Sequence, residues 1–208
     1  PVISSAASDV YKRQISNIIK SDISFQERNS KNFDYSIIHQ PANLKLSKLY
    51  VFKLKNFKDY QIRDFHVLGG HLNSLIKFYN ETNVIVYPDG ISSSKVGSLN
   101  AISEMILGMS LASYSFTKYF SKKDDKKNKN KTKTKKKKVK IYSSQHTRLA
   151  KNYESISAIH QGVTLTRNLV TEPPNVMTPP KIAEYAKSLG EYGVDVKVLG
   201  EKEMKKLG

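Results

Sequence analysis

The stretch from Thr166 to Pro180, TRNLVTEPPNVMTPP, constrains the fold more than any other part of the chain. Its apolar spacing up to Val170 continues a helical pattern from the preceding residues. Pro173 and Pro174 then fix two successive φ angles and remove two backbone donors, so an arriving helix has to end. Glu172 precedes a proline and is therefore biased away from helical geometry. The sequence predicts a long helix that stops at this point.

A second helix is expected to begin directly afterwards. Thr178 is a favourable N-cap, because its hydroxyl can accept a hydrogen bond from a free N–H group of the first turn. Pro179 suits the first helical position, where its missing N–H costs nothing. We call residues 173–178 the proline joint. Because this joint is short and stiff, it should fix the orientation of the preceding part of the chain against the part that follows.

The periodicity of the remaining chain indicates an α/β fold. Short runs rich in aromatic and β-branched residues alternate with longer segments of helical spacing, an order typical of crossover connections. Strands are expected at 33–39, 48–54, 83–88, 139–142 and 194–198, and helices at 60–79, 97–119, 150–171, 179–189 and 201–207. Gly69 and Gly70 interrupt the first helix, and we interpret them as a close-packing site and not as a phosphate-binding fingerprint. Gly190 or Gly193 is expected to close the fourth helix.

Each long helix has a candidate buried face. The pattern assigns inward positions to Leu99, Ile102, Met105, Ile106, Met109, Ala112 and Phe116, to Ile156, Ile159, Val163, Leu169 and Val170, and to Ile182, Ala183, Ala186 and Leu189. The two methionines of the first set are expected to fill core space and not to bind a ligand.

Most of the basic charge comes from one segment. Residues 121–140 contain 12 Lys and 2 Asp, so they supply +10 of the net charge of +17. We interpret residues 121–138 as a Lys-rich, solvated loop inserted between a helix and a strand. The alternative is a nucleic-acid-binding module, in which lysines such as Lys135, Lys136, Lys137 and Lys138 displace counterions from phosphates. The segment lacks Arg and aromatic residues, which favours weak polyanion binding over sequence reading.

The sequence contains no recognisable catalytic constellation. The five His have no metal-ligand spacing, and no GxSxG nucleophile elbow occurs. We therefore assign no catalytic and no metal-binding residue. No apolar run is long enough to cross a membrane, and the chain has neither a secretory segment nor a Cys, a combination that fits a cytoplasmic protein.

The region of the proline joint resembles the leucyl aminopeptidase, or cytosol aminopeptidase, family (M17). TRNLVTEPPNVMTPP is similar to the family's ARDLVNEPPN…TP step, and EKEMKKLG at the end of the chain is similar to its next helix start. ILGMSLASYSFTKYF and Gly69-Gly70 also match upstream features, so the resemblance covers about residues 48–208. Lys53-Leu54-Lys55 departs from a frequent family GLG, and the Lys-rich insertion is longer than usual.

The resemblance implies a domain order. Residues 1–14 are expected to be a non-native or disordered tail, residues 15–149 an N-terminal macro-like α/β domain, residues 150–172 a linker helix, and residues 173–208 the start of a catalytic metallopeptidase domain. A free-standing macro-like ligand-binding domain is a further hypothesis, but the linker helix and the joint argue against it.

The resemblance also implies a function for the parent protein. Members of the family are aminopeptidases that release N-terminal amino acids from peptides, use two divalent metals, zinc or manganese, and form homohexamers; some bacterial members also bind DNA. Their NTDAEGR and DTGG motifs, which carry metal ligands, have no counterpart here. We therefore expect a fragment that serves assembly, binds no metal and lacks activity, and we expect the reading frame to continue beyond Gly208.

Overall fold

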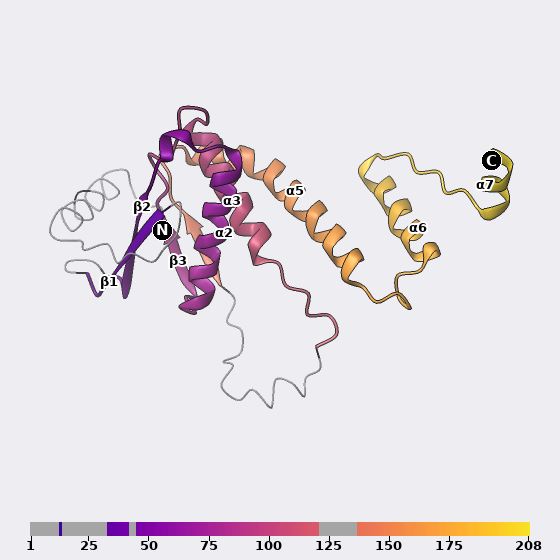
Figure 1. Ribbon diagram of the computed structural model, residues 1–208, viewed down its shortest axis with the longest axis horizontal. Helices are drawn as coiled ribbons and strands as arrows, with labels where there is room; N and C mark the ends of the chain where they lie inside the picture. The colour runs from indigo at the N-terminus through magenta and orange to yellow at the C-terminus, as the bar shows by residue number, and fades with distance from the viewer. Residues whose placement is uncertain (1–12, 14–32, 42–44, 121–136) are drawn as a thin grey trace. The chain divides into compact units, whose positions relative to one another are not determined.

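The computed structural model describes residue 13 and residues 33–41, 45–120 and 137–208 (Figure 1). Contacts divide the chain into two units, one of residues 1–61 and 92–97 and the other of residues 62–91 and 98–208. The described elements are β1 (Phe33–His39), β2 (Lys48–Leu54), η1 (Phe57–Asp59), α2 (Ile62–Phe78), β3 (Asn83–Val86), α3 (Ser98–Ser113), β4 (Lys138–Ile141), α5 (His146–Thr171), α6 (Pro179–Ser188), η2 (Leu189–Tyr192) and α7 (Glu201–Leu207). The described residues combine helices with two pairs of strands, so the predicted α/β class is confirmed.

The first unit is built on an antiparallel pair of strands. β1 and β2 pair along their full length, with Phe33 opposite Leu54 and His39 opposite Lys48. The ring of Phe52 lies 5.7 Å from that of Phe33, a cross-strand aromatic contact of the kind that stabilises sheets. Lys55 neutralises the buried carboxylate of Asp34 at 2.6 Å. Both strands occur where the sequence predicts them.

The second unit contains a parallel pair of strands. β3 and β4 are in register from Asn83 opposite Lys138 to Val86 opposite Ile141. Parallel strands require a long crossover, and α3 lies between these two strands in the sequence. The predicted crossover topology is therefore present in this unit.

Helices α2 and α3 lie side by side and cross at two glycines (Figure 1). A Cβ atom on Gly69 would lie 2.0 Å from the carbonyl oxygen of Met105, and one on Gly108 would lie 2.1 Å from the carbonyl oxygen of His66. The two backbones are thus in direct contact, which only glycine permits. The interpretation of Gly69 as a close-packing position is confirmed, and the fully buried side chains of Phe65 and Ile102 belong to these two helices.

Helix α3 is shorter than the sequence predicts. It ends at Ser113 instead of continuing to Tyr119. The residues that follow contact α5: the hydroxyl of Tyr114 donates to Oδ1 of Asn168 at 3.1 Å, and the guanidinium of Arg167 lies over the Tyr114 ring. Leaving the helix lets this segment run beside α5. Side-chain contacts to a distant helix therefore override the local helical pattern.

Helix α5 buries only the beginning of its predicted apolar face. Leu149 and Ile156 are buried, whereas Ile159 and Val170 are 52% and 80% exposed. Of the predicted inward positions of α6, Ile182 and Leu189 are exposed, at 51% and 37%, and Ala183 and Ala186 are half-buried. The prediction is confirmed at Ile156 and was wrong at Ile159, Val170, Ile182 and Leu189. A helical stripe is buried only where another element covers it, and the helix that packs on α5, α3, ends at Ser113.

The proline joint has the local geometry that the sequence predicts. α5 ends at Thr171, and Glu172 is extended with φ −62° and ψ 140°. α6 begins at Pro179 after an extended Thr178. The Thr178 side chain makes no capping hydrogen bond with the described residues, so the expected hydroxyl cap is wrong although its position is right. Gly193 adopts φ 80° and closes the following 3₁₀ turn, as expected of one of the two candidate glycines.

The predicted strand at 194–198 does not form. These residues lie within the described part of the chain but have no regular secondary structure. Their alternation of Val with polar residues suits a half-buried strand, yet a strand requires a hydrogen-bonded neighbour, and the described strands pair with one another. α7 follows where a helix is expected.

Candidate functional site

The described residues do not assemble a metal centre. Across 33–41, 45–120 and 137–208, no three His, Cys, Asp or Glu side chains lie close enough to hold an ion. None of the helices in the same ranges is long and apolar enough to span a bilayer. No catalytic or metal-binding residue was predicted from the sequence, and the candidate sites are the basic residues, a pocket and the proline joint.

The predicted basic site is only partly described. Lys135 and Lys136 lie outside the described residues. Lys137 donates from Nζ to the carbonyl oxygen of Ile76 at 3.2 Å, and Lys138 is exposed at the start of β4. Binding of nucleic acid by these lysines stays a prediction, but Lys137 has a structural contact that the sequence did not indicate.

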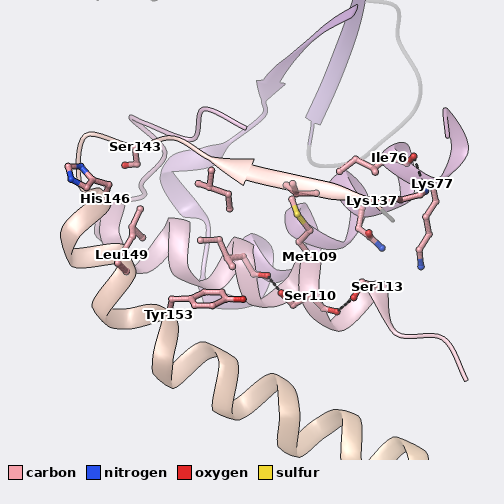
Figure 2. A pocket seen from close by; sticks show the side chains of 15 residues that line it. Ile76, Lys77, Met109, Ser110, Ser113, Lys137, Ser143, His146, Leu149 and Tyr153 are labelled. Carbon is pink, nitrogen blue, oxygen red and sulfur yellow. Dashed lines mark hydrogen bonds between the residues drawn. The ribbon is translucent and has the colours of Figure 1, made fainter. Parts of the chain in front are cut away.

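A pocket of about 650 Å³ opens between β4 and the helices α2, α3 and α5 (Figure 2). Helix α2 provides Ile76 and Lys77, α3 provides Met109, and α5 provides Leu149 and other residues. The complete lining is Asn73, Ile76, Lys77, Ile106, Met109, Ser110, Ser113, Lys137, Val139, Ile141, Ser143, His146, Leu149, Ala150 and Tyr153. No pattern in the sequence indicates this pocket, because its walls come from four elements that are far apart in the chain.

One end of the pocket is fixed by a hydrogen-bonded turn. Asp89, just after β3, accepts from the Ser143 hydroxyl at 2.5 Å and from the backbone N–H of Ser144 at 2.9 Å. The turn leads directly into α5 at His146, which lines the pocket beside Ser143. Asp89 therefore holds the beginning of α5 against the ends of the parallel strands.

The proline joint is held by a second polar cluster, which we call the Glu172 cluster: Lys118, Tyr119 and Glu172. Nζ of Lys118 lies 2.6 Å from Oε1 of Glu172, and the Tyr119 hydroxyl donates to Oε2 of the same carboxylate. The Glu172 side chain is 6% exposed and that of Lys118 is 54% exposed, so the carboxylate is shielded from solvent while its cation is half-exposed. This cluster attaches the segment after α3 to the last residue before Pro173.

The cluster shifts the titration of all three groups. The hydrogen bond from Lys118, followed by that from Tyr119, lowers the pKa of Glu172 below its ordinary value of 4.5. The hydrogen bond to Glu172 raises the pKa of Lys118 above 10.5 and the pKa of Tyr119 above 10.0. The Glu172 contribution to stability is present above its unfolded pKa and lost as pH falls through its lower folded pKa. The Lys118 and Tyr119 contributions are present below their unfolded pKa values and lost as pH rises through the raised ones.

Glu172→Gln should therefore lower the thermal midpoint of unfolding near neutral pH and have little effect in strong acid. The amide keeps the shape of the side chain but removes the charge that Lys118 and Tyr119 face. Glu184→Gln is the matched control, because Glu184 and Lys181 form an exposed pair that should contribute little. Thermal unfolding followed by circular dichroism across pH provides the measurement. Equal effects of the two substitutions, or an effect of Glu172→Gln that persists below its folded pKa, would contradict the role of the cluster.

Sequence comparison relates the chain to aminopeptidases. No family model matches it, but curated proteins do. A probable cytosol aminopeptidase of Rhizobium johnstonii is 34% identical over 168 residues, which are 81% of this chain and 32% of that protein. The corresponding protein of Agrobacterium fabrum is 40% identical over 133 residues, 63% of this chain and 25% of that protein. The one of Methylorubrum populi is 29% identical over 172 residues, 83% of this chain and 32% of that protein.

Solved structures share the fold. The bottromycin maturation enzyme BotP superposes with a TM-score of 0.56 and 14% identity, covering 84% of this chain and 35% of that chain. A structure of BotP in complex with Mn gives a TM-score of 0.59 and 16% identity, covering 84% of this chain and 34% of that chain. At this identity the likeness concerns the fold alone.

The matched region includes most of this chain but only part of each relative. The chain spans about a third of the length of the first curated relatives that it matches. The matched 81% is longer than the proline joint and its flanking helices alone, so the relationship does not depend on one short motif. Over about 81% of its length, this chain is homologous to curated proteins described as probable cytosol aminopeptidases.

Proposed function

We propose that this chain is the part of a metal-dependent aminopeptidase that supports assembly, and that the parent protein releases N-terminal amino acids from peptides. The observation that carries the proposal is the 34% identity over 168 residues to a probable cytosol aminopeptidase. The match covers 32% of that relative, which leaves most of the relative's length for the residues that perform the reaction.

In this proposal, the residues that perform the reaction belong to another part of the parent protein. Two divalent ions, zinc or manganese, would polarise the scissile carbonyl and activate a water in the parent protein. The residues described here would instead hold the proline joint in place through the Glu172 cluster. A cytoplasmic homohexamer with peptide substrates completes the proposal, as does weak polyanion binding by the Lys-rich insertion.

This chain alone should not hydrolyse leucine p-nitroanilide, with or without added Mn²⁺ or Zn²⁺. The reason is that it lacks the family's metal-binding motifs and that its described residues hold no cluster of metal-ligating side chains. Hydrolysis is measured by release of p-nitroaniline, and the full-length relative serves as the positive control. Hydrolysis by this chain that Mn²⁺ stimulates and a chelator abolishes would contradict the proposal.

A chimera tests the positive part of the proposal. The 168 matched residues of the Rhizobium johnstonii relative are replaced by those of this chain, and the remainder of the relative is kept. We expect an assembly of the same size as the relative, with metal-stimulated hydrolysis. A chimera that assembles normally but has no activity would show that this chain cannot take the place of that segment.

A further inference from the structure

The pocket between β4 and the helices α2, α3 and α5 has no role in the proposed peptidase function. We propose that it binds a small amphipathic anion, a carboxylate with an apolar body. Its volume of about 650 Å³ lies within the range of roughly 300–1,000 Å³ that is typical of small-molecule sites. The ligand class follows from three features of the pocket: an apolar wall, a positively charged end and the buried amide of Asn73.

The wall along the middle of the pocket is apolar. Ile76, Met109 and Leu149 line it and are each less than a tenth exposed, and Ile106 and Ile141 add further aliphatic surface. Figure 2 shows Met109, Leu149 and the ring of Tyr153 around the same space. An apolar ligand that covers this wall binds favourably, because apolar surface of both the wall and the ligand is removed from water.

One end of the pocket carries positive charge. Lys77 and Lys137 lie at the end near Ile76, opposite Ser143 and His146 (Figure 2). Nζ of Lys77 donates to the carbonyl oxygen of Ala112 at 2.8 Å, and Nζ of Lys137 donates to that of Ile76 at 3.2 Å. An ammonium group has three donors, so each lysine retains donors for a ligand. Both printed partners are backbone carbonyls, and no carboxylate among the described residues pairs with either charge.

The two lysines favour a negatively charged ligand, and the apolar wall favours a ligand that carries only one charge. A carboxylate would be held by charge-assisted hydrogen bonds from the two ammonium groups. A doubly charged phosphate would lose more hydration energy on entering a largely aliphatic space. A monoanion with an apolar body satisfies both parts of the pocket.

Asn73 supplies a further polar group on the wall. Its residue is 7% exposed, and its Nδ2 has no hydrogen-bond partner among the described residues. Buried polar groups are nearly always paired, so an unpaired amide at a pocket wall calls for a partner. Because Nδ2 is itself enclosed, the Asn73 side chain would have to turn for its N–H to reach a ligand oxygen in the pocket. This amide therefore supports the same ligand class as the lysines.

The first experiment titrates decanoate, below its micelle concentration, into this chain labelled with ¹³C at its methionine methyl groups. Of the four methionines, Met109 lines the pocket, whereas Met105, Met177 and Met204 lie outside its lining. We expect a saturable shift of the Met109 methyl resonance and none at the other three. Decyltrimethylammonium carries the same chain with the opposite charge and should not produce the shift. Equal shifts with both compounds, no shift at Met109, or parallel shifts of all four methyl groups would overturn the proposal.

Variants then separate the charged end from the apolar wall. Lys77→Met combined with Lys137→Met should weaken decanoate binding at least about tenfold, as expected when charge-assisted hydrogen bonds are lost. Lys151→Met combined with Lys187→Met removes the same charge away from the pocket and should leave binding unchanged. Ala150→Phe places a ring in the pocket from an exposed helical position and should abolish the Met109 shift without unfolding the chain. Wild-type affinity in either the double lysine variant or the Ala150→Phe variant, with native thermal unfolding, would overturn the proposal.

Discussion

Gly69→Ala should destabilise the second unit by about 3 kcal/mol or more, a large part of the total stability of an ordinary domain. The new methyl group would lie 2.0 Å from the carbonyl oxygen of Met105 and 2.7 Å from the backbone nitrogen of Met109. Both are backbone atoms of α3, so no side-chain rotation relieves the overlap. The two helices would have to move apart along their shared interface. Urea unfolding followed by far-UV circular dichroism measures the loss.

The neighbouring glycine gives a matched control in the same helix. A Cβ atom on Gly70 would lie 3.9 Å from the Cβ atom of Ala112, which is ordinary van der Waals contact. Gly70→Ala should therefore be neutral or stabilise the unit by up to about 1 kcal/mol, because alanine is the better helix former. If the two substitutions have similar effects, the close crossing of α2 and α3 is not what stabilises this unit.

The parts of the fold that could be predicted are those set by local chemistry. Pro173 and Pro174 end α5, and Pro179 starts α6, because each acts on its own backbone and immediate neighbours. The helical periodicity of α2 likewise locates that helix to within two residues. These features require no knowledge of what lies elsewhere in the chain.

The predictions that were wrong depend on distant partners. Val194, Val196 and Val198 have the pattern of a strand but no described strand to pair with. α3 ends early, where contacts to α5 replace its last predicted turns. The C-terminal half of α5 stays exposed because α3 no longer covers it. Periodicity identifies the side of an element that can be buried, but the tertiary fold decides whether anything covers it.

The candidate site was still harder to predict. Glu172 and Lys118 are 54 residues apart, and neither belongs to a recognisable motif. The pocket combines residues of α2, α3, β4 and α5, so it exists only once these elements are packed. The resemblance to cytosol aminopeptidases, by contrast, was visible in the sequence at the proline joint, since the joint is contiguous.

Phe65→Ala should destabilise the second unit by about 3–5 kcal/mol, the usual cost of removing a fully buried aromatic side chain. Phe65 is 0% exposed in α2, and its neighbours in the α2–α3 interface are held by the backbone contact at Gly69, so they cannot close around the cavity. The matched control is Phe78→Ala at the end of the same helix, where the side chain is 72% exposed and the loss should be below about 1 kcal/mol.

The same pair of variants tests whether the α2–α3 core also positions the pocket. Phe65 does not line the pocket, but Asn73, Ile76 and Lys77 follow it on α2 and do. If the rigid crossing sets the place of α2, Phe65→Ala should weaken the decanoate-dependent shift of the Met109 methyl group even at temperatures where the variant is folded. Phe78→Ala should leave it unchanged. A folded Phe65→Ala variant with wild-type decanoate affinity would show that α2 keeps its position without this side chain, and a stability loss equal to that of Phe78→Ala would show that Phe65 is not in the core.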